Sequence, residues 1–139
     1  MKARVQWLDG RAFVGESGSG HAAVMDVAPE SGGRNIGVRP MEMLLLGLGG
    51  CTAFDVVMIL ERMREKVTAL DIELEAERAS EDPKVFTKVK LIYKLKGYGL
   101  KESSVARAVN LSAEKYCSAS IMLAKTAEIT HDFEIVELP

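Results

Sequence analysis

Two cysteines are the residues of this sequence with the most distinctive chemistry. Cys51 follows two glycines in GLGGCTAFD, residues 47–55, and Cys117 lies in KYCSAS, residues 115–120. They stand far apart in the sequence, without a C-x-x-C partner or a histidine at metal-ligand spacing. Each cysteine is therefore open to four interpretations: a small buried residue, half of a disulfide, a metal ligand or a nucleophile.

Metal and phosphate sites have little support from the residue spacing. A zinc ion could take Cys51, Cys117, His21 and His131 as ligands, but these residues lack the short-range pairs typical of structural zinc. The glycine-rich stretch GESGSG, residues 15–20, lacks the Lys-Ser/Thr ending of a phosphate loop and indicates a turn. We therefore expect no metal and no cofactor.

A long helix is predicted to carry Cys51. Pro40 suits its first position, Glu42 suits its positive N-terminal end, and the apolar run that continues to Arg64 predicts a mostly buried helix. Glycine disfavours a helix interior, so the three glycines within residues 47–50 indicate either a break before Cys51 or the close approach of another backbone.

The reactivity of Cys51 depends on which of these alternatives holds. A helix that restarts here, with Thr52 and Asp55 as a capping pair, would put the thiol at a helix N-terminus, where a thiolate is stabilised. A continuous helix from Pro40 would remove that benefit. In either case Asp55, one turn after Cys51, disfavours the thiolate unless a cation pairs with the carboxylate. A neighbouring arginine is therefore expected.

Alternating groups of strands and helices are expected to position the two cysteines. Polar–apolar alternation predicts the strands, and apolar residues at steps of four from Val105 to Cys117 predict a second helix with Cys117 on its inner face. The expected order is three strands, a helix, two strands, a helix and a strand, in a single domain, residues 1–139. The expected strands cover residues 2–7, 11–17, 21–27, 70–78, 85–96 and 128–138, and the expected helices cover residues 40–64, 101–116 and 118–127, with a mobile loop over residues 28–39.

Charge and hydropathy narrow the class of protein. The net charge of -2, with Lys and Arg mixed among Asp and Glu, leaves no basic surface for nucleic acid. The N-terminus alternates polar and apolar residues and does not resemble a secretory signal. Residues 43–60 reach the lower length limit of a membrane span, but three glycines and Asp55 favour a buried helix. We therefore expect a cytoplasmic protein with neither a membrane nor a nucleic-acid partner.

The surroundings of both cysteines resemble those of the OsmC/Ohr family of osmotically inducible and organic hydroperoxide resistance proteins. The resemblance rests on RPMEMLLLGLGGCTAFDVVMIL, residues 39–60, on SAEKYCSASIMLAKTAEITHDFEI, residues 112–135, and on the three strands that precede them. It spans essentially the whole chain, and its most specific feature is the order of two helices that each carry a cysteine.

The resemblance implies an α+β fold in which antiparallel sheets wrap central, cysteine-bearing helices in an intertwined homodimer. It further implies a thiol-dependent peroxidase for organic hydroperoxides in oxidative or osmotic stress defence. In that mechanism Cys51 is peroxidatic and Cys117 resolving, and a dithiol reductant reopens the resulting disulfide. The side chains expected to wall the substrate pocket are Leu44, Leu48, Phe54, Met58 and Ile121.

The sequence departs from the family pattern where Cys51 would be activated. Family peroxidases usually carry a glutamate ten positions before the first cysteine; this chain has Met41 there, and Glu42 is rotated from it by about 100° around the helix. The chain therefore resembles a divergent branch, whose alternative function is a weakly active or non-enzymatic dimer that binds a small hydrophobic ligand or senses oxidants. The arginines that could activate Cys51 come from the N-terminal region: Arg11, Arg34 and Arg39.

Overall fold

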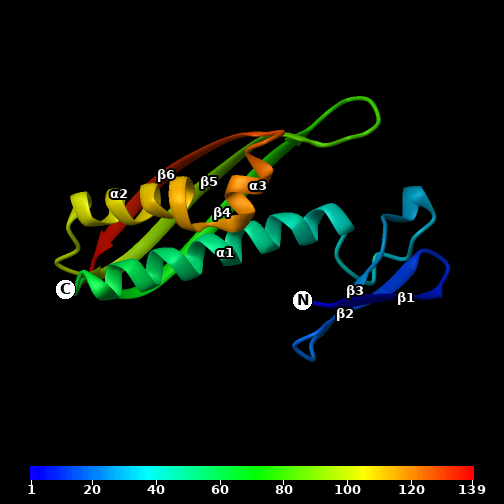
Figure 1. Ribbon diagram of the computed structural model, residues 1–139, viewed down its shortest axis with the longest axis horizontal. Helices are drawn as coiled ribbons and strands as arrows, with labels where there is room; N and C mark the ends of the chain where they lie inside the picture. The colour runs from blue at the N-terminus through cyan, green and yellow to red at the C-terminus, as the bar shows by residue number, and fades with distance from the viewer. The chain divides into compact units, whose positions relative to one another are not determined.

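The computed structural model describes residues 1–139 (Figure 1). The chain forms two compact units, residues 1–46 and residues 47–139. The strands and helices form an α+β fold, the class that the family resemblance implies. In chain order the elements are β1 (Ala3–Asp9), β2 (Ala12–Ser17), β3 (Ala22–Met25), η1 (Pro29–Ser31), α1 (Pro40–Arg62), β4 (Lys66–Arg78), β5 (Phe86–Tyr98), α2 (Glu102–Leu111), η2 (Ser112–Tyr116), α3 (Ser118–Leu123) and β6 (Glu128–Glu137).

The first unit is built on the antiparallel sheet β1-β2-β3. The predicted turn at Asp9 and Gly10 joins β1 to β2, and Gly10 has the positive φ of 53° that glycine adopts without strain. Trp7 pairs with Phe13 across the hairpin, and Phe13 pairs in turn with Met25 of β3. The three predicted strands of this region are therefore confirmed.

The loop after β3 folds back around the buried carboxylate of Asp26. This carboxylate accepts backbone N–H groups from Val27 at 2.7 Å and from Arg34 at 3.0 Å, and a third, longer one from Ile36. The predicted loop also contains the short 3-10 helix η1. It is packed so closely that a Cβ at Gly33 would collide with the carbonyl of Val27. Asp26 therefore anchors the segment that was predicted to be mobile.

Acid should release this anchor. Burial raises the pKa of Asp26, but the three backbone N–H groups and the Arg34 charge outweigh it and hold that pKa below its ordinary value of 3.8. A carboxyl group whose pKa is lower in the folded than in the unfolded protein stabilises the fold at pH values above its unfolded-state pKa. This stabilisation is lost as the pH falls through its folded-state pKa. We expect the amide protons of Arg34 and Ile36 to titrate together below about pH 4 in NMR spectra. In Asp26→Asn this shared titration should be absent, and its persistence there would contradict the assignment.

The second unit contains the sheet β4-β5-β6. Strands β4 and β5 form the predicted antiparallel hairpin, with Leu74 opposite Leu91. The expectation of purely antiparallel sheets is wrong for β5 and β6, which run parallel. The reason is the connection: the chain passes through α2, η2 and α3 before it re-enters the sheet, and a long helical crossover returns a strand in the same direction.

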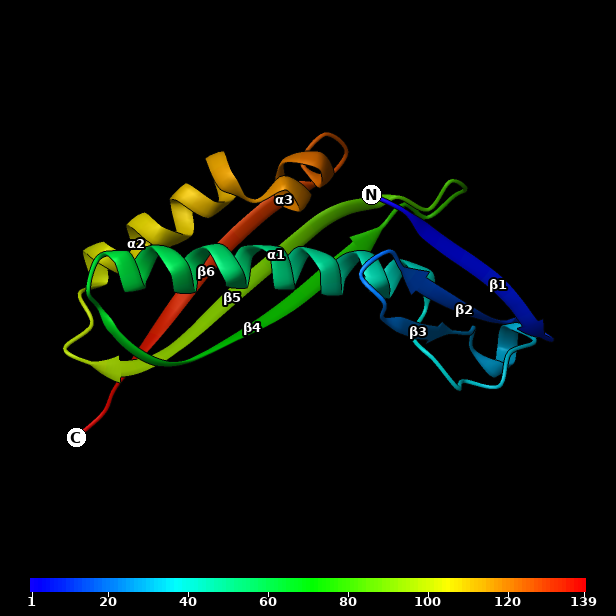
Figure 2. The same ribbon diagram turned by 60° about the horizontal axis from the view of Figure 1, so that its bottom comes forward.

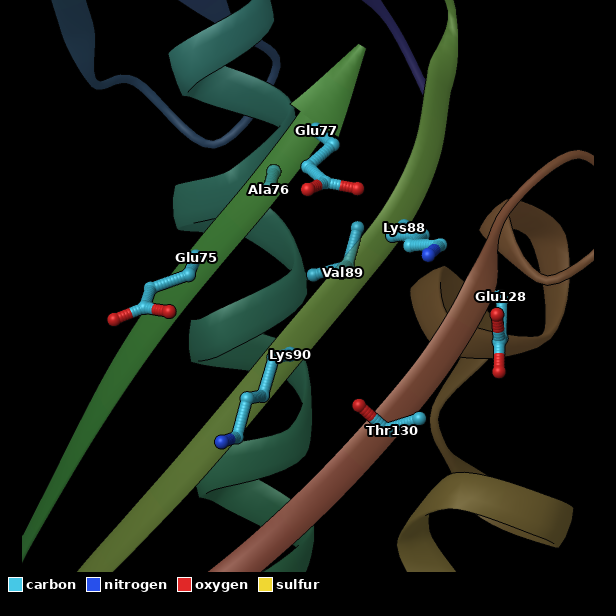
Figure 3. A pocket seen from close by; sticks show the side chains of 8 residues that line it. All are labelled: Glu75, Ala76, Glu77, Lys88, Val89, Lys90, Glu128 and Thr130. Carbon is cyan, nitrogen blue, oxygen red and sulfur yellow. The ribbon is translucent and has the colours of Figure 1, made fainter.

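One face of this sheet is charged and exposed, as the alternation predicts. Lys94 Nζ lies 2.7 Å from Glu73 Oε1, and the neighbouring pairs Glu75–Lys90 and Glu77–Lys88 stand opposite each other in register. Figure 3 shows the side chains of these last two pairs around a shallow hollow that Glu128 and Thr130 of β6 complete. The hollow mixes both charges and contains neither cysteine, so we interpret it as a solvated strand ladder.

The other face of the sheet packs against the helices of the second unit (Figure 2). Alternate side chains of β5 turn inward, and one stripe of α1 and one of α2 meet them. Burying such apolar side chains supplies the main driving force for this unit. The fully or nearly fully buried apolar residues of these three elements are Leu48, Val56, Ile59, Leu60, Phe86, Val89, Leu91, Tyr93, Leu95, Val105, Ala108 and Val109.

Helix α1 runs without a break through its glycines. A Cβ at Gly49 would lie 3.1 Å from a methyl group of Leu74, so this glycine allows β4 to pack closely on the helix. Gly47 and Gly50 face open space. Of the two sequence alternatives, the break is therefore wrong, and the close approach is made by a side chain rather than by another backbone.

The prediction that α1 is mostly buried is also wrong. By length and apolar composition this helix could cross a membrane, because an 18-residue stretch of it has a mean hydropathy of 2.1. Only 33% of that stretch is buried within the protein. Core helices of soluble proteins pass the same test. The exposed apolar side chains are Leu44, Leu46 and Phe54, with 48%, 59% and 66% of their surface accessible. An apolar surface of this kind typically marks a site of association.

Candidate functional site

The two cysteines come together inside the second unit. Cys51 lies in the middle of α1 and is half-buried. Cys117 lies between η2 and α3, as the N-cap residue of α3, and has no accessible surface. Both are free thiols. The Cys51 side chain lies close enough to the Cys117 thiol to help raise the pKa of that thiol. Of the alternatives left open by the sequence, this arrangement favours two thiols that can react with each other over two unrelated packing residues.

The Cys117 thiol is held in its protonated form. Burial raises its pKa to about 12, and Cys51 and Asp55 act in the same direction. One group opposes them, the backbone N–H of Ser120, which donates to Cys117 Sγ at 3.3 Å. Because a thiolate rather than a thiol is the nucleophile, Cys117 is unreactive by itself at neutral pH. The more accessible Cys51 is left as the thiol that a reactant can reach.

A buried chain of polar side chains lies beside the cysteine pair. Thr52 Oγ1 lies 2.7 Å from the hydroxyl of Tyr93 and 2.7 Å from Ser112 Oγ, and Ser112 in turn donates to Asp55 Oδ2 at 3.0 Å. Thr52 is adjacent in sequence to Cys51, and the backbone N–H of Cys117 donates to the carbonyl of Ser112 at 2.8 Å. These hydrogen bonds therefore connect the two segments that carry the cysteines.

The sequence does not reveal this chain, because an unexpected turn creates it. Steps of four predicted that Ala113 faces inward, but residues 112–116 form a π-helical turn, and Ser112 is the residue with no accessible surface. Single-turn π-helices commonly occur at functional sites. Thr52 and Asp55 would have formed a capping pair in a helix that restarts near Cys51, but α1 has no N-terminus there and both side chains bond to Ser112 instead. A buried tyrosine with a threonine partner carries no signal in the sequence.

The hydroxyl of Tyr93, at one end of these buried hydrogen bonds, stays protonated. Burial raises the pKa of its hydroxyl by more than the hydrogen bond shared with Thr52 lowers it, and the neighbouring Cys117 and Asp55 side chains act in the same direction as burial. Tyr93 therefore remains a neutral donor over the physiological pH range.

Glu42 serves as a helix cap. Its Oε1 accepts the backbone N–H of Arg39 at 2.7 Å, the reciprocal half of a capping box at the start of α1. The guanidinium of Arg39 donates to Asn35 Oδ1 at 2.7 Å and to the carbonyl of Gly37 at 3.2 Å. Both candidate supporting residues thus have partners within the N-terminal loop.

The other two candidate arginines also lie in the unit formed by residues 1–46. Arg34 pairs with the carboxylate of Asp9. Arg11 is exposed in the turn between β1 and β2. An activating role for any of the three remains a prediction.

Two of the expected pocket residues line one hollow. Phe54 and Met58 border an open space of about 470 Å³ on the exposed side of α1, which Leu70 of β4 and Glu61 also line. The remaining three candidates lie elsewhere: Leu48 is fully buried in the core, whereas Leu44 and Ile121 are exposed. The hollow is mainly apolar, and Ala53 and Val57 complete its lining.

The hydrogen bonds of the two histidines are made to residues other than the cysteines, through the ring of His131 and through the backbone of His21. His131 of β6 forms a hydrogen bond to Asn110 Oδ1 of α2 at 3.1 Å, and the backbone N–H of His21 donates to Ser17 Oγ. No group of three or more His, Cys, Asp or Glu side chains gathers in a way that could hold a metal ion.

Comparisons with known proteins give a consistent result. A model of the OsmC-like protein family matches residues 32–132. Protein YhfA of Escherichia coli is 48% identical over 136 residues, which cover 98% of each chain. A structure from a structural genomics programme is 44% identical, covers 99% of this chain and 100% of its own, and superposes with a TM-score of 0.90. An organic hydroperoxide resistance protein OsmC from Legionella pneumophila is 15% identical, with 96% and 95% coverage and a TM-score of 0.71, which indicates a shared fold.

Proposed function

The chain belongs to the OsmC-like protein family, and on that premise we propose that it is a thiol-dependent peroxidase that reduces organic hydroperoxides. In this proposal residues 1–139 act as one OsmC-like domain in oxidative or osmotic stress defence. The name of the Legionella pneumophila relative, an organic hydroperoxide resistance protein, agrees with this activity but was given to a distant member. The observation that carries the proposal is the pairing of half-buried Cys51 with fully buried Cys117.

The pair supports a division of labour between the two thiols. The Cys51 thiol first loses its proton, and the thiolate then attacks the terminal oxygen of ROOH. The O–O bond breaks, the terminal oxygen stays on sulfur with its hydrogen as a sulfenic acid, and the alkoxide takes up the proton released by Cys51 and leaves as ROH. The Cys117 thiol then condenses with Cys51–SOH, which forms the S–S bond and releases water. A dithiol reductant gives up two electrons and two protons to restore both thiols.

The hollow beside Phe54 and Met58 supports an apolar substrate. Its lining suits the hydrocarbon part of an organic hydroperoxide better than hydrogen peroxide, because apolar surface gains from burying apolar groups. We place the organic group of the substrate in this hollow.

Peptide mapping after peroxide treatment tests the proposal. Addition of cumene hydroperoxide to the reduced native chain should consume both thiols and yield a peptide pair linked by Cys51 and Cys117, which dithiothreitol then reopens. Loss of both thiols without this linked pair would overturn the two-cysteine mechanism. Peroxide consumption should continue for many turnovers while dithiothreitol is present.

Glu42 supports a second candidate function, a weakly active or non-enzymatic protein that binds a small hydrophobic ligand or senses oxidants. Its carboxylate is engaged as a helix cap, and Met41 occupies the position where peroxidases of the family usually carry glutamate. The two candidates differ in turnover. A binder or sensor would form the disulfide once and would not consume excess hydroperoxide with dithiothreitol.

We further propose that the protein acts as a cytoplasmic homodimer. Leu44, Leu46 and Phe54 expose an apolar face of α1, and a second copy of the chain could cover this face. Sedimentation equilibrium should then give twice the chain mass of 15.2 kDa. A mass of 15.2 kDa at micromolar concentration would contradict the dimer.

A further inference from the structure

The direction of the buried hydrogen bonds follows from a count of protons. Each hydroxyl has one proton to donate, and the Ser112 proton goes to the Asp55 carboxylate. Ser112 must therefore accept its second bond from Thr52, and Thr52 must accept from Tyr93. The hydrogen bonds therefore run in one direction: Tyr93 donates to Thr52, Thr52 to Ser112, and Ser112 to Asp55. The Asp55 carboxylate fixes this direction because its oxygen can only accept.

Ser112 is the member of this chain that reaches both cysteine segments. Its hydroxyl bonds to Thr52 and Asp55 of α1, which lie one residue and one turn after Cys51. Its carbonyl accepts the backbone N–H of Cys117 across the π-helical turn. All these bonds are buried, where hydrogen bonds are strengthened by the low dielectric and a lost partner is costly. Ser112 therefore sets how the Cys117 segment lies against α1.

We propose that Ser112, held by Asp55, is a positioning residue that aligns Cys117 with Cys51 for closure of their disulfide. The inference rests on the proposed two-cysteine function but concerns its second step. In that step the Cys117 sulfur attacks the sulfur of Cys51–SOH and the S–O bond breaks. The proton of the Cys117 thiol passes to the departing hydroxide, which leaves as water. Because a protonated thiol is a weak nucleophile, this step depends on close alignment of the two sulfurs.

Ser112→Ala should separate the two steps of the reaction. We expect trapping of the Cys51 sulfenic acid with dimedone to begin at the native rate, because Cys51 and the hollow are unchanged. Disulfide closure should slow by about tenfold, in line with the loss of one buried hydrogen-bonding group. The sulfenic acid should then persist and be oxidised further, so sulfinic acid at Cys51 should rise in mass spectra. A change in stability alone would not produce this split.

Asp55 offers a matched pair of variants. Asp55→Asn keeps an oxygen that accepts the Ser112 hydroxyl, so closure should stay within about twofold of native. Asp55→Ala removes that acceptor and should slow closure as Ser112→Ala does, which also provides the test if the serine variant does not fold. Ser103→Ala makes the same change at an exposed position of α2 and should close at the native rate.

A second oxidant distinguishes failure of this inference from failure of the proposed function. Diamide takes two hydrogens from a pair of thiols and closes the disulfide without peroxide. If diamide closes the disulfide slowly in Ser112→Ala and the native protein does not react with cumene hydroperoxide, the positioning role would be retained and the peroxidase function rejected. Native closure rates in both Ser112→Ala and Asp55→Ala would overturn the positioning role, whatever the outcome with peroxide.

Discussion

Cys51→Ser should lower the consumption of cumene hydroperoxide with dithiothreitol to the rate measured without protein. A serine hydroxyl does not ionise near neutral pH and cannot attack the peroxide bond, and buried Cys117 is held protonated with a pKa of about 12. Cys117→Ser should behave differently: it should consume peroxide in a first rapid turnover, because Cys51 is intact. The measurement is loss of hydroperoxide against time, at several ratios of peroxide to protein.

The contrast between the two variants decides the order of the cysteines. If Cys117 were the attacking thiol, Cys117→Ser would lose the first turnover and Cys51→Ser would keep it. If both variants matched the native chain, the enzymatic function would fail altogether. A serine exposed on α3 provides the control: Ser118→Ala leaves both thiols in place and should retain the native rate.

The strand and helix order could be predicted because local pattern and tertiary role agree. The alternation in β4 puts acids outward and Leu70, Ile72 and Leu74 inward, which is how the strand lies. The basic partner strand follows from the same rule, and Lys94 does meet Glu73. Two cysteine-bearing helices in this order were enough to indicate the family, which the match over residues 32–132 bears out.

The features that the sequence concealed depend on contacts between distant segments. The parallel pairing of β5 with β6 follows from a helical crossover whose path no local pattern specifies. Periodicity assumes a regular helix, so the π-helical turn exchanged Ala113 for Ser112 on the inner face. The buried partners of Thr52 are 41 and 60 positions away in the chain.

The engagement of Glu42 as a cap bears on how Cys51 could be activated. A carboxylate that accepts the Arg39 N–H supports the start of α1, which carries Cys51 further along. The Arg39 guanidinium is directed to Asn35 and Gly37. The sequence left open whether this chain keeps the glutamate–arginine arrangement of its family. The hydrogen bonds assign Glu42 a structural task, which makes the thiol assay above the critical measurement.

Leu48→Ala should lower the free energy of unfolding by about 2–5 kcal/mol, the range for truncating a buried leucine. Leu48 has no accessible surface and lies one turn before Cys51, on the stripe of α1 that meets the sheet. It was expected to wall the substrate pocket, whereas its burial predicts that it acts mainly on stability. Urea unfolding followed by circular dichroism measures the loss, and the affinity for hydroperoxide should change little.

Leu44→Ala is the matched control, because it makes the same truncation one turn earlier on α1 where 48% of the side chain is accessible. In an isolated chain a surface truncation should cost within about 0.5 kcal/mol. If α1 is instead covered by a second copy, the effect of Leu44→Ala should grow with protein concentration through weaker association, whereas removing Leu48 leaves a cavity within each chain. Equal losses at both positions, independent of concentration, would contradict the burial that distinguishes these two leucines.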